Sequence, residues 1–282
     1  MFEPWSHSKL KKYNNCKREF YFQYYLKIKP EDFGLSPVVW DTQQLGNDSH
    51  KVMEHAVTKM RAKQSFNLKE LISAVCSKDN YGRPVKSGVL DLKRKTDLLK
   101  LVRGMKEFVI SSKELLQGYP LLIESSFVLD VNGMCKPATY KNPWDMYTDK
   151  TCKFVSKPDL VINAFDKIHI FDYKTNEKIT ADYPWVGEYI KQLEEYAPVV
   201  QQALDPSKDV QVNLVNLYTG ECISQEYAAS IIPAMLADLE SKIPVIVDAQ
   251  GFDYSKPNTF PKCCKFCPFK GKCDDIYQSI VS

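Results

Sequence analysis

The chain lacks the features that mark several classes of protein. Its 282 residues contain no apolar run that approaches the roughly 18 residues of a membrane-spanning helix. It has no internal repeat and no low-complexity tract, which excludes collagen-like, repeat and disordered chains. The segment Met1–Trp5 lacks the basic-then-apolar pattern of a signal peptide, so we expect a cytoplasmic protein with no membrane association. No Gly-x-x-x-x-Gly-Lys-Ser/Thr motif occurs, and a helicase motor is therefore not expected.

The chain also has little net charge, but its charges are unevenly distributed. The 38 basic and 35 acidic residues leave a formal charge of +3. Residues 1–29 hold seven bases and two acids, residues 86–113 hold eight and three, and residues 256–273 hold five and none. Each of these blocks carries +5, so the remaining residues carry −12. A single lysine-rich block is typical of a solvated helix face, whereas three blocks interleaved with aromatic residues favour a nucleic-acid partner.

Cysteine usage excludes a secreted disulfide scaffold, because the nine cysteines are odd in number and the chain is long. Four of them fall within residues 263–273, where Cys264, Cys267 and Cys273 have the spacing C-x2-C-x5-C. In a reducing compartment such a group indicates a metal centre. Four thiolates bind either zinc or an iron–sulfur cluster, so three from this tail need a fourth.

Hydrophobic periodicity predicts an α/β or α+β fold with a mixed sheet. Helices are predicted over 6–28, 42–63, 66–76, 93–116, 185–203 and 226–243. Strands are predicted over 121–131, 159–162, 168–173 and 210–218. Residues 132–152 are interpreted as a polar loop that contains aromatic residues.

The sharpest local pattern is an apolar strand that ends in Asp172, Tyr173 and Lys174. Side chains two residues apart lie on the same side of a strand, so the Asp172 carboxylate and the Lys174 ammonium are expected together. Asp159 opens the preceding strand, and a hairpin between the two strands would bring both carboxylates to one end. Such a pair can hold a divalent cation while the lysine activates water or offsets developing charge. An Asp-x-Lys triplet alone also fits an ordinary surface salt bridge.

Two predicted helices add polar residues to this hypothesis. His50 and Glu54 are four residues apart on the second helix, and Gln192 and Tyr196 are four apart on the helix over 185–203. Each pair therefore lies on one helix face. Alone, either pair would fit an ordinary structural histidine or a polar helix surface.

Taken in order, these motifs resemble the RecB-like branch of the PD-(D/E)XK nuclease superfamily. They are Gly-x-x-x-His-x-x-x-Glu (46–54), Pro-Asp (158–159), Asp-Tyr-Lys-Thr (172–175) and Gln-Leu-x-x-Tyr-Ala (192–197). The resemblance spans positions 5–273 and implies a restriction-endonuclease-like core, with Asp172 where many relatives have Glu. The residue roles that it implies are metal ligation by His50, Asp159, Asp172 and the Tyr173 carbonyl, catalysis by Lys174, assistance by Gln192 and Tyr196, and additional contributions from Glu54 and Glu124.

The same resemblance extends to the cysteines. Cys16 lies in a motif, Leu10-x-x-Tyr13-x-x-Cys16, that is similar to the iron–sulfur subgroup of these nucleases, the AddB-type and CRISPR-associated RecB-like proteins. It implies a 4Fe–4S cluster on Cys16, Cys264, Cys267 and Cys273, with structural Zn²⁺ as the alternative. Cys263 has no assigned role, and Lys17 stands where the family often has proline.

We therefore expect a Mg²⁺- or Mn²⁺-dependent deoxyribonuclease of a bacterium or an infecting phage, acting on DNA ends or single strands in recombination, repair or DNA processing. Residues 1–282 are expected to form one nuclease domain, with an iron–sulfur region over 1–30 and 255–282, a helical part over 42–116 and a catalytic sheet core over 119–220. A recombination or replication protein is a possible partner. The alternatives are a non-catalytic iron–sulfur or zinc DNA-binding module and a zinc-stabilised protein outside nucleic-acid metabolism.

Overall fold

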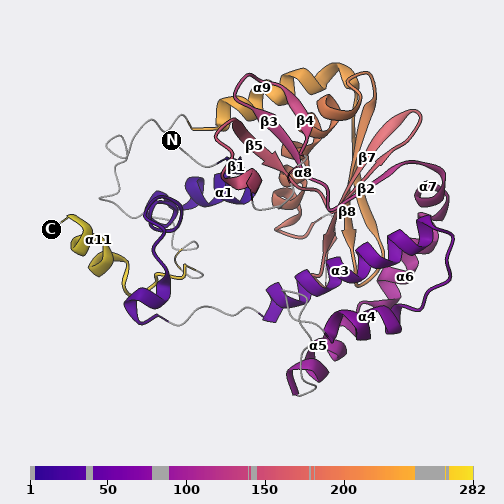
Figure 1. The fold of residues 1–282 in the computed structure, drawn as a ribbon, viewed down its shortest axis with the longest axis horizontal. Coiled ribbons are helices and arrows are strands. Elements are labelled where there is room, and N and C mark those ends of the chain that lie inside the picture. The colour runs from indigo at the N-terminus through magenta and orange to yellow at the C-terminus, as the bar shows by residue number, and fades with distance from the viewer. Residues whose placement is uncertain are drawn as a thin grey trace.

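The computed structural model places two mixed β-sheets among helices, which confirms the predicted α/β class (Figure 1). It describes residues 4–35, 41–77, 89–138, 140, 145–177, 179–180, 182–244, 264 and 267–281. Within these ranges no helix is both long enough and apolar enough to cross a membrane. Cys263, to which the sequence assigns no role, lies outside the described residues.

The larger sheet has five strands in the order β2-β6-β7-β8-β9. Their bounds are β2 (Leu121–Ile123), β6 (Leu160–Asn163), β7 (Lys167–Lys174), β8 (Asp209–Asn216) and β9 (Cys222–Tyr227). Strands β7 and β8 are parallel, and every other neighbouring pair is antiparallel. A parallel pair needs a crossover connection, which here contains α8 (Val186–Leu204).

The smaller sheet has four strands in the order β1-β5-β3-β4. They are β1 (Trp5–Ser6), β3 (Phe127–Asp130), β4 (Cys135–Pro137) and β5 (Cys152–Ser156), with a 3₁₀ turn at Asp145–Tyr147 before β5. The β3–β4 hairpin turns at Asn132-Gly133, as its sequence predicts, and Gly133 has a φ of 80°. Strand β1 pairs in parallel with β5, so the start of the chain is part of this sheet.

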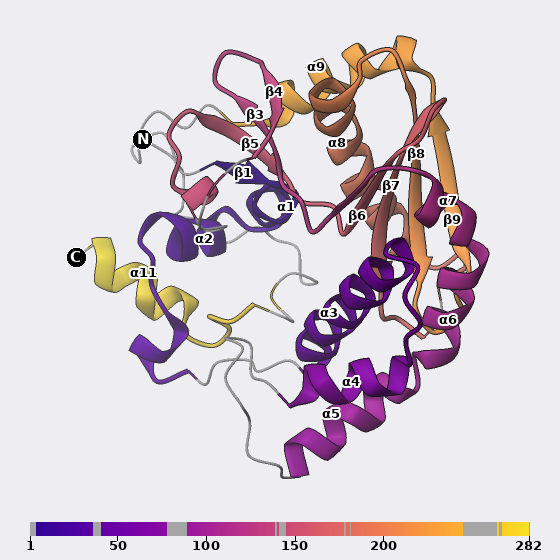
Figure 2. The ribbon, with the colours of Figure 1, turned by 45° about the vertical axis from the view of Figure 1, so that its right-hand side comes forward.

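Helix α8 packs between the two sheets, which explains its largely buried surface (Figure 2). Leu193, Ala197 and Val200 of this helix share one apolar cluster with Phe127 and Phe154 of the smaller sheet. The same cluster includes the α8-facing side chains of β7 and β8. A 3₁₀ turn (Ala229–Ile231) leads into α9 (Ile232–Lys242), which packs on α8 from outside.

A layer of helices covers the opposite face of the larger sheet (Figure 2). Its members are α3 (Asp41–Arg61), α4 (Leu68–Cys76), α5 (Val89–Leu99), α6 (Val102–Ser111) and α7 (Lys113–Gly118). Within this layer the Arg94 side chain reaches the buried Asp48 carboxylate with two nitrogens, each at 2.8 Å. This paired contact joins α5 to α3, the helix that carries His50.

The first and last described segments lie together beside the two sheets (Figures 1 and 2). The N-terminal elements are α1 (His7–Asn15), α2 (Lys17–Phe20), a π-helical turn (Tyr21–Tyr25) and a 3₁₀ turn (Pro30–Phe33). Phe22 packs against Phe269 and Ile276, the latter in α11 (Cys273–Val281), and all three are fully buried. Phe22 is therefore a neighbour of residues that lie 247 and 254 positions later in the chain.

Several predicted elements differ from those observed. The predicted helix 6–28 is broken at Cys16, whose backbone is extended and whose sulfur caps α2. The predicted helix 93–116 is three helices, α5 to α7. The predicted strand 121–131 is two strands in different sheets, because the chain turns at Glu124, which has a φ of 48°. Strands β1, β4, β5 and β9 were not predicted, whereas α3, α4, β6, β7, α8 and β8 were.

Helix α6 approaches the end of β8 so closely that Gly104 has no space for a side chain. A Cβ atom there would lie 2.3 Å from the Leu217 carbonyl oxygen, a backbone atom that cannot move aside. We predict that Gly104→Ala lowers the free energy of unfolding by about 1–3 kcal/mol despite the better helix propensity of alanine.

The matched control is Gly187→Ala in the first turn of α8, where a Cβ meets nothing within 4 Å. This change should leave stability unchanged or raise it by up to about 1 kcal/mol. Urea unfolding of both variants measures the difference, and equal midpoints would show that α6 does not pack as described.

Candidate metal centre

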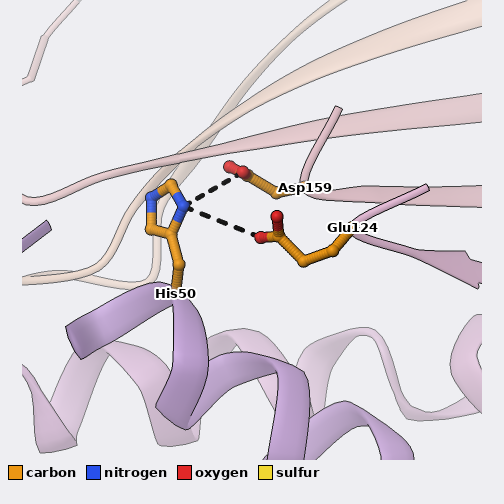
Figure 3. Close-up of side chains that lie close together, drawn as sticks. All are labelled: His50, Glu124 and Asp159. Atoms are coloured by element: carbon orange, nitrogen blue, oxygen red, sulfur yellow. Dashed lines mark ion pairs between the residues drawn. The ribbon is translucent and has the colours of Figure 1, made fainter. Parts of the chain in front are cut away.

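Three potential ligands meet where α3 passes the ends of two strands (Figure 3). His50 belongs to α3, Glu124 directly follows β2, and Asp159 directly precedes β6. Their ligand atoms lie within 4.8 Å of one another, and no other group of three such residues is found in the described part of the chain. His50 Nδ1 is 3.1 Å from Asp159 Oδ1 and 3.9 Å from Glu124 Oε1. Imidazole and carboxylate are both ligands of divalent cations.

The backbone of Tyr173 fixes two of these side chains. Its carbonyl oxygen lies 3.1 Å from His50 Nε2, and its N–H donates to Asp159 Oδ2 at 2.6 Å. The β6–β7 pairing places Asp159 beside this peptide, because Leu160 pairs with Phe171. The predicted meeting of Asp159 with the end of β7 is thus what the structure shows.

The carboxylates determine the protonation of His50. Burial alone would lower its pKa, but the charge of Asp159 and its hydrogen bond, together with Asp172 and Glu124, raise the pKa to about 9. In that protonated state both ring nitrogens donate, one to Asp159 and one to Tyr173. A metal cation held by His50 instead requires the neutral imidazole ring. The carboxylates therefore face a positive charge in both states, either the protonated ring or the metal cation.

Asp172 and Lys174 lie on the α8 side of β7, as the strand period predicts. Asp172 is 3% exposed, and its Oδ2 atom is 2.5 Å from Lys174 Nζ. Burial has the largest effect and raises the pKa of Asp172. The charge of Lys174 lowers this pKa and the charge of Asp159 raises it, and the net result is a rise. Burial also opposes the charge of Lys174, but Asp172 keeps its pKa above the ordinary value.

The buried Asp172 Oδ2 atom faces the Lys174 ammonium, which is its charge and hydrogen-bond partner. Asp159 is close enough for its charge to act on this carboxyl group. The ligand atoms of His50, Asp159 and Glu124, together with the Tyr173 carbonyl, fit a divalent cation. The predicted ligand Asp172 is not part of this three-residue group, and its carboxylate pairs with Lys174.

Helix α8 carries the polar groups that face Lys174. Lys174 Nζ donates to Gln192 Oε1 at 3.4 Å, and Gln192 Nε2 donates to the Tyr196 hydroxyl at 3.0 Å. The ammonium also lies 4.8 Å from the centroid of the Tyr189 ring. Sequence reasoning did not include Tyr189, although its position three residues before Gln192 places it on the same helix face.

The structure changes the roles of two residues near the ligands, Glu54 and Lys157. Glu54 is exposed on α3 and is not part of the ligand group. Lys157, which was not singled out, lies 2.9 Å from Glu124 Oε2 and keeps a positive charge beside that carboxylate. Its position directly before Pro158-Asp159 was the only signal in the sequence.

The predicted thiol ligands lie in the region joined by Phe22 and Phe269. Cys16 is buried, Cys267 and Cys273 are half-buried, and Cys264 is exposed. The charges of Cys16, Cys267 and Cys273 act on one another, and burial raises the pKa of Cys267 to about 12. Three predicted ligands from the two ends of the chain are therefore neighbours.

A buried arginine contacts this group of thiols. Arg18 is 2% exposed, and its Nη1 lies 3.6 Å from Cys273 Sγ and 2.6 Å from Asp274 Oδ1. The guanidinium also stacks on the Tyr277 ring at 4.5 Å. Burial raises the pKa of the Cys273 thiol, and the contact with Arg18 opposes that rise in favour of the thiolate that metal ligation needs.

Comparisons with known proteins place the chain in a family. No curated protein matched. A solved structure described as the crystal structure of SSO0001 is 13% identical, with 79% of this chain and 82% of that chain covered, but its TM-score of 0.26 supports no argument. The model of the PD-(D/E)XK nuclease superfamily matches residues 4–274. With that match across nearly the whole chain, and with a site rich in acidic residues beside a lysine, the protein belongs to the PD-(D/E)XK nuclease superfamily.

Proposed function

We propose that the protein is a metal-dependent exonuclease that hydrolyses phosphodiester bonds at DNA ends or in single strands. The observation that supports this most strongly is the convergence of His50, Asp159 and Glu124 next to the buried Asp172–Lys174 pair. Membership of the nuclease superfamily supports hydrolysis in general, while the finer choice of exonuclease activity, with a role in recombination or repair, is our proposal.

In this proposal Asp159, Asp172, His50 and the Tyr173 carbonyl hold Mg²⁺ or Mn²⁺. The cation, when bound, supplies positive charge to the scissile phosphate and makes water a better nucleophile. Lys174 stabilises negative charge on the phosphate or takes part in orienting the attacking water. Gln192 fixes the position of the ammonium, and Tyr196 in turn fixes Gln192.

We predict that Lys174→Ala lowers the rate of DNA cleavage by about 10²–10⁴-fold while the folded structure persists. Loss of Lys174 removes a charge that lowers the pKa of Asp172, so burial then favours the protonated carboxyl group over an unpaired buried charge. The matched control is Lys167→Ala at the other end of β7, where the ammonium pairs with the exposed Glu226. Digestion rates and circular dichroism of both variants are compared, and full activity of Lys174→Ala in a nuclease-free preparation contradicts the assignment.

Glu124 and Glu54 give a test variant and a matched control for metal binding. Because Glu124 lies within ligand distance of His50 and Asp159, Glu124→Gln should raise the Mn²⁺ dissociation constant by about 10- to 100-fold. Glu54→Gln removes the same charge from an exposed position and should change the constant less than twofold. Isothermal titration of each variant with Mn²⁺ gives the two constants, and an equal effect would remove Glu124 from the site.

We further propose that Cys16, Cys264, Cys267 and Cys273 bind a 4Fe–4S cluster. The mutual interaction of three of these thiols and the contact of Arg18 with Cys273 support a metal centre. In a 4Fe–4S cluster each iron takes one thiolate, so the four sulfur atoms lie farther apart than they would around a single ion. Among the described residues these cysteines do not form a group with all ligand atoms within 4.8 Å of one another, which favours the cluster.

Anaerobic purification tests this proposal. The protein should be brown with broad visible absorption, and Cys16→Ser should lose both the colour and bound iron. Cys222→Ser, which changes an exposed cysteine in β9, should keep them. A colourless protein with stoichiometric zinc would show that the centre is a zinc site instead.

A further inference from the structure

A line of side chains on α8 leads from the surface to Lys174. Trp185, Tyr189, Gln192 and Tyr196 follow one another at intervals of four, three and four residues, which is the spacing of one helix face. Trp185, at the N-terminus of the helix, is 49% exposed, Tyr189 is half-buried, and Tyr196 is 7% exposed. Exposure thus decreases along the line toward the interior.

The buried part of this line is part of the candidate active site. Lys174 Nζ contacts both the Tyr189 ring and Gln192 Oε1. Trp185 lies four residues before Tyr189, which corresponds to about 6 Å along the helix axis. Trp185 is therefore one helical turn outward from Tyr189, whose ring contacts the lysine that we place at the scissile phosphate.

Positive charge accompanies the exposed indole. Lys11 of α1 lies over the Trp185 ring at 5.7 Å, and the same ammonium is 3.3 Å from Glu188 Oε2. An exposed aromatic ring with a lysine over it is a combination with which proteins bind single-stranded nucleic acid, by base stacking and by attraction of the backbone.

We propose that Trp185 stacks on the base of a nucleotide adjacent to the scissile phosphate and thereby positions a single strand for cleavage. Lys11 supports this contact, because its ammonium lies over the Trp185 ring and places a positive charge there for the phosphate backbone of a bound strand. The inference rests on the proposed nuclease function. Trp185 is then a positioning residue and takes no part in the chemical step.

Binding of a labelled oligo-dT strand tests the proposal in the Lys174→Ala background, which removes cleavage from the measurement. Trp185→Ala should raise the dissociation constant by about 5- to 150-fold, the range found for loss of one stacked base. Trp185→Phe keeps an aromatic face and should stay within about threefold of the parent. The control is Phe165→Ala, because Phe165 is 88% exposed just before the distant end of β7.

An abasic scan separates stacking from a structural effect. An abasic nucleotide is placed at each position of the strand in turn, and at one position it should weaken binding as much as Trp185→Ala does. On that strand Trp185→Ala should have no further effect, whereas on the others it should keep its full effect. Additive losses at every position would overturn the proposal.

Kinetics of the active enzyme distinguish this inference from the proposed function. Trp185→Ala should raise KM for single-stranded DNA and change kcat much less. If the parent protein degrades DNA and Trp185→Ala has the parent KM, the stacking inference is wrong and the nuclease assignment stands. If the parent neither binds nor degrades DNA, both are wrong.

Discussion

The burial of opposite charges at the end of β7 is the constraint on which the rest of the structure depends. Asp159 and Asp172 are each less than 10% exposed, and an uncompensated buried carboxylate would cost several kcal/mol. Two cations approach from different elements, Lys174 from β7 and His50 from α3. The site therefore needs α3 to pass the strand ends, and the helices α4 to α7 bury the other side of α3.

Tyr173 contacts the proposed metal ligands, Lys174 is the proposed catalytic lysine, and the side chains of these two consecutive residues of β7 face opposite sides of the sheet. The Tyr173 side chain points toward the α3 layer. Its backbone carbonyl contacts His50, and its backbone N–H donates to Asp159. Lys174, the next residue, faces α8 and its line of polar and aromatic side chains. In the proposed function, this alternation along one strand lets the cation ligands and the Lys174 ammonium act on the same phosphate. Helices α3 and α8 hold the two sets of side chains on opposite faces of the sheet.

Sequence reasoning succeeded where local patterns determine structure. The strand period placed Asp172 and Lys174 together, and the apolar spacing of residues 42–63 predicted α3 almost to its bounds. It failed where distant contacts decide. Two-residue β1 exists only because it pairs with β5, and the carboxylate of Glu124 reaches His50 through a left-handed turn that no local pattern indicated. The helix break at Cys16 likewise depends on one sulfur capping the next helix.

Digestion of DNA strands labelled at the 5′ or the 3′ end by the intact, anaerobically purified protein tests the proposed nuclease activity most directly. We expect degradation from an end that depends on added Mg²⁺ or Mn²⁺ and stops when the cation is chelated, and the order of product release gives the polarity. DNA that stays intact at every metal concentration, although the protein is folded and binds the strand, would contradict it.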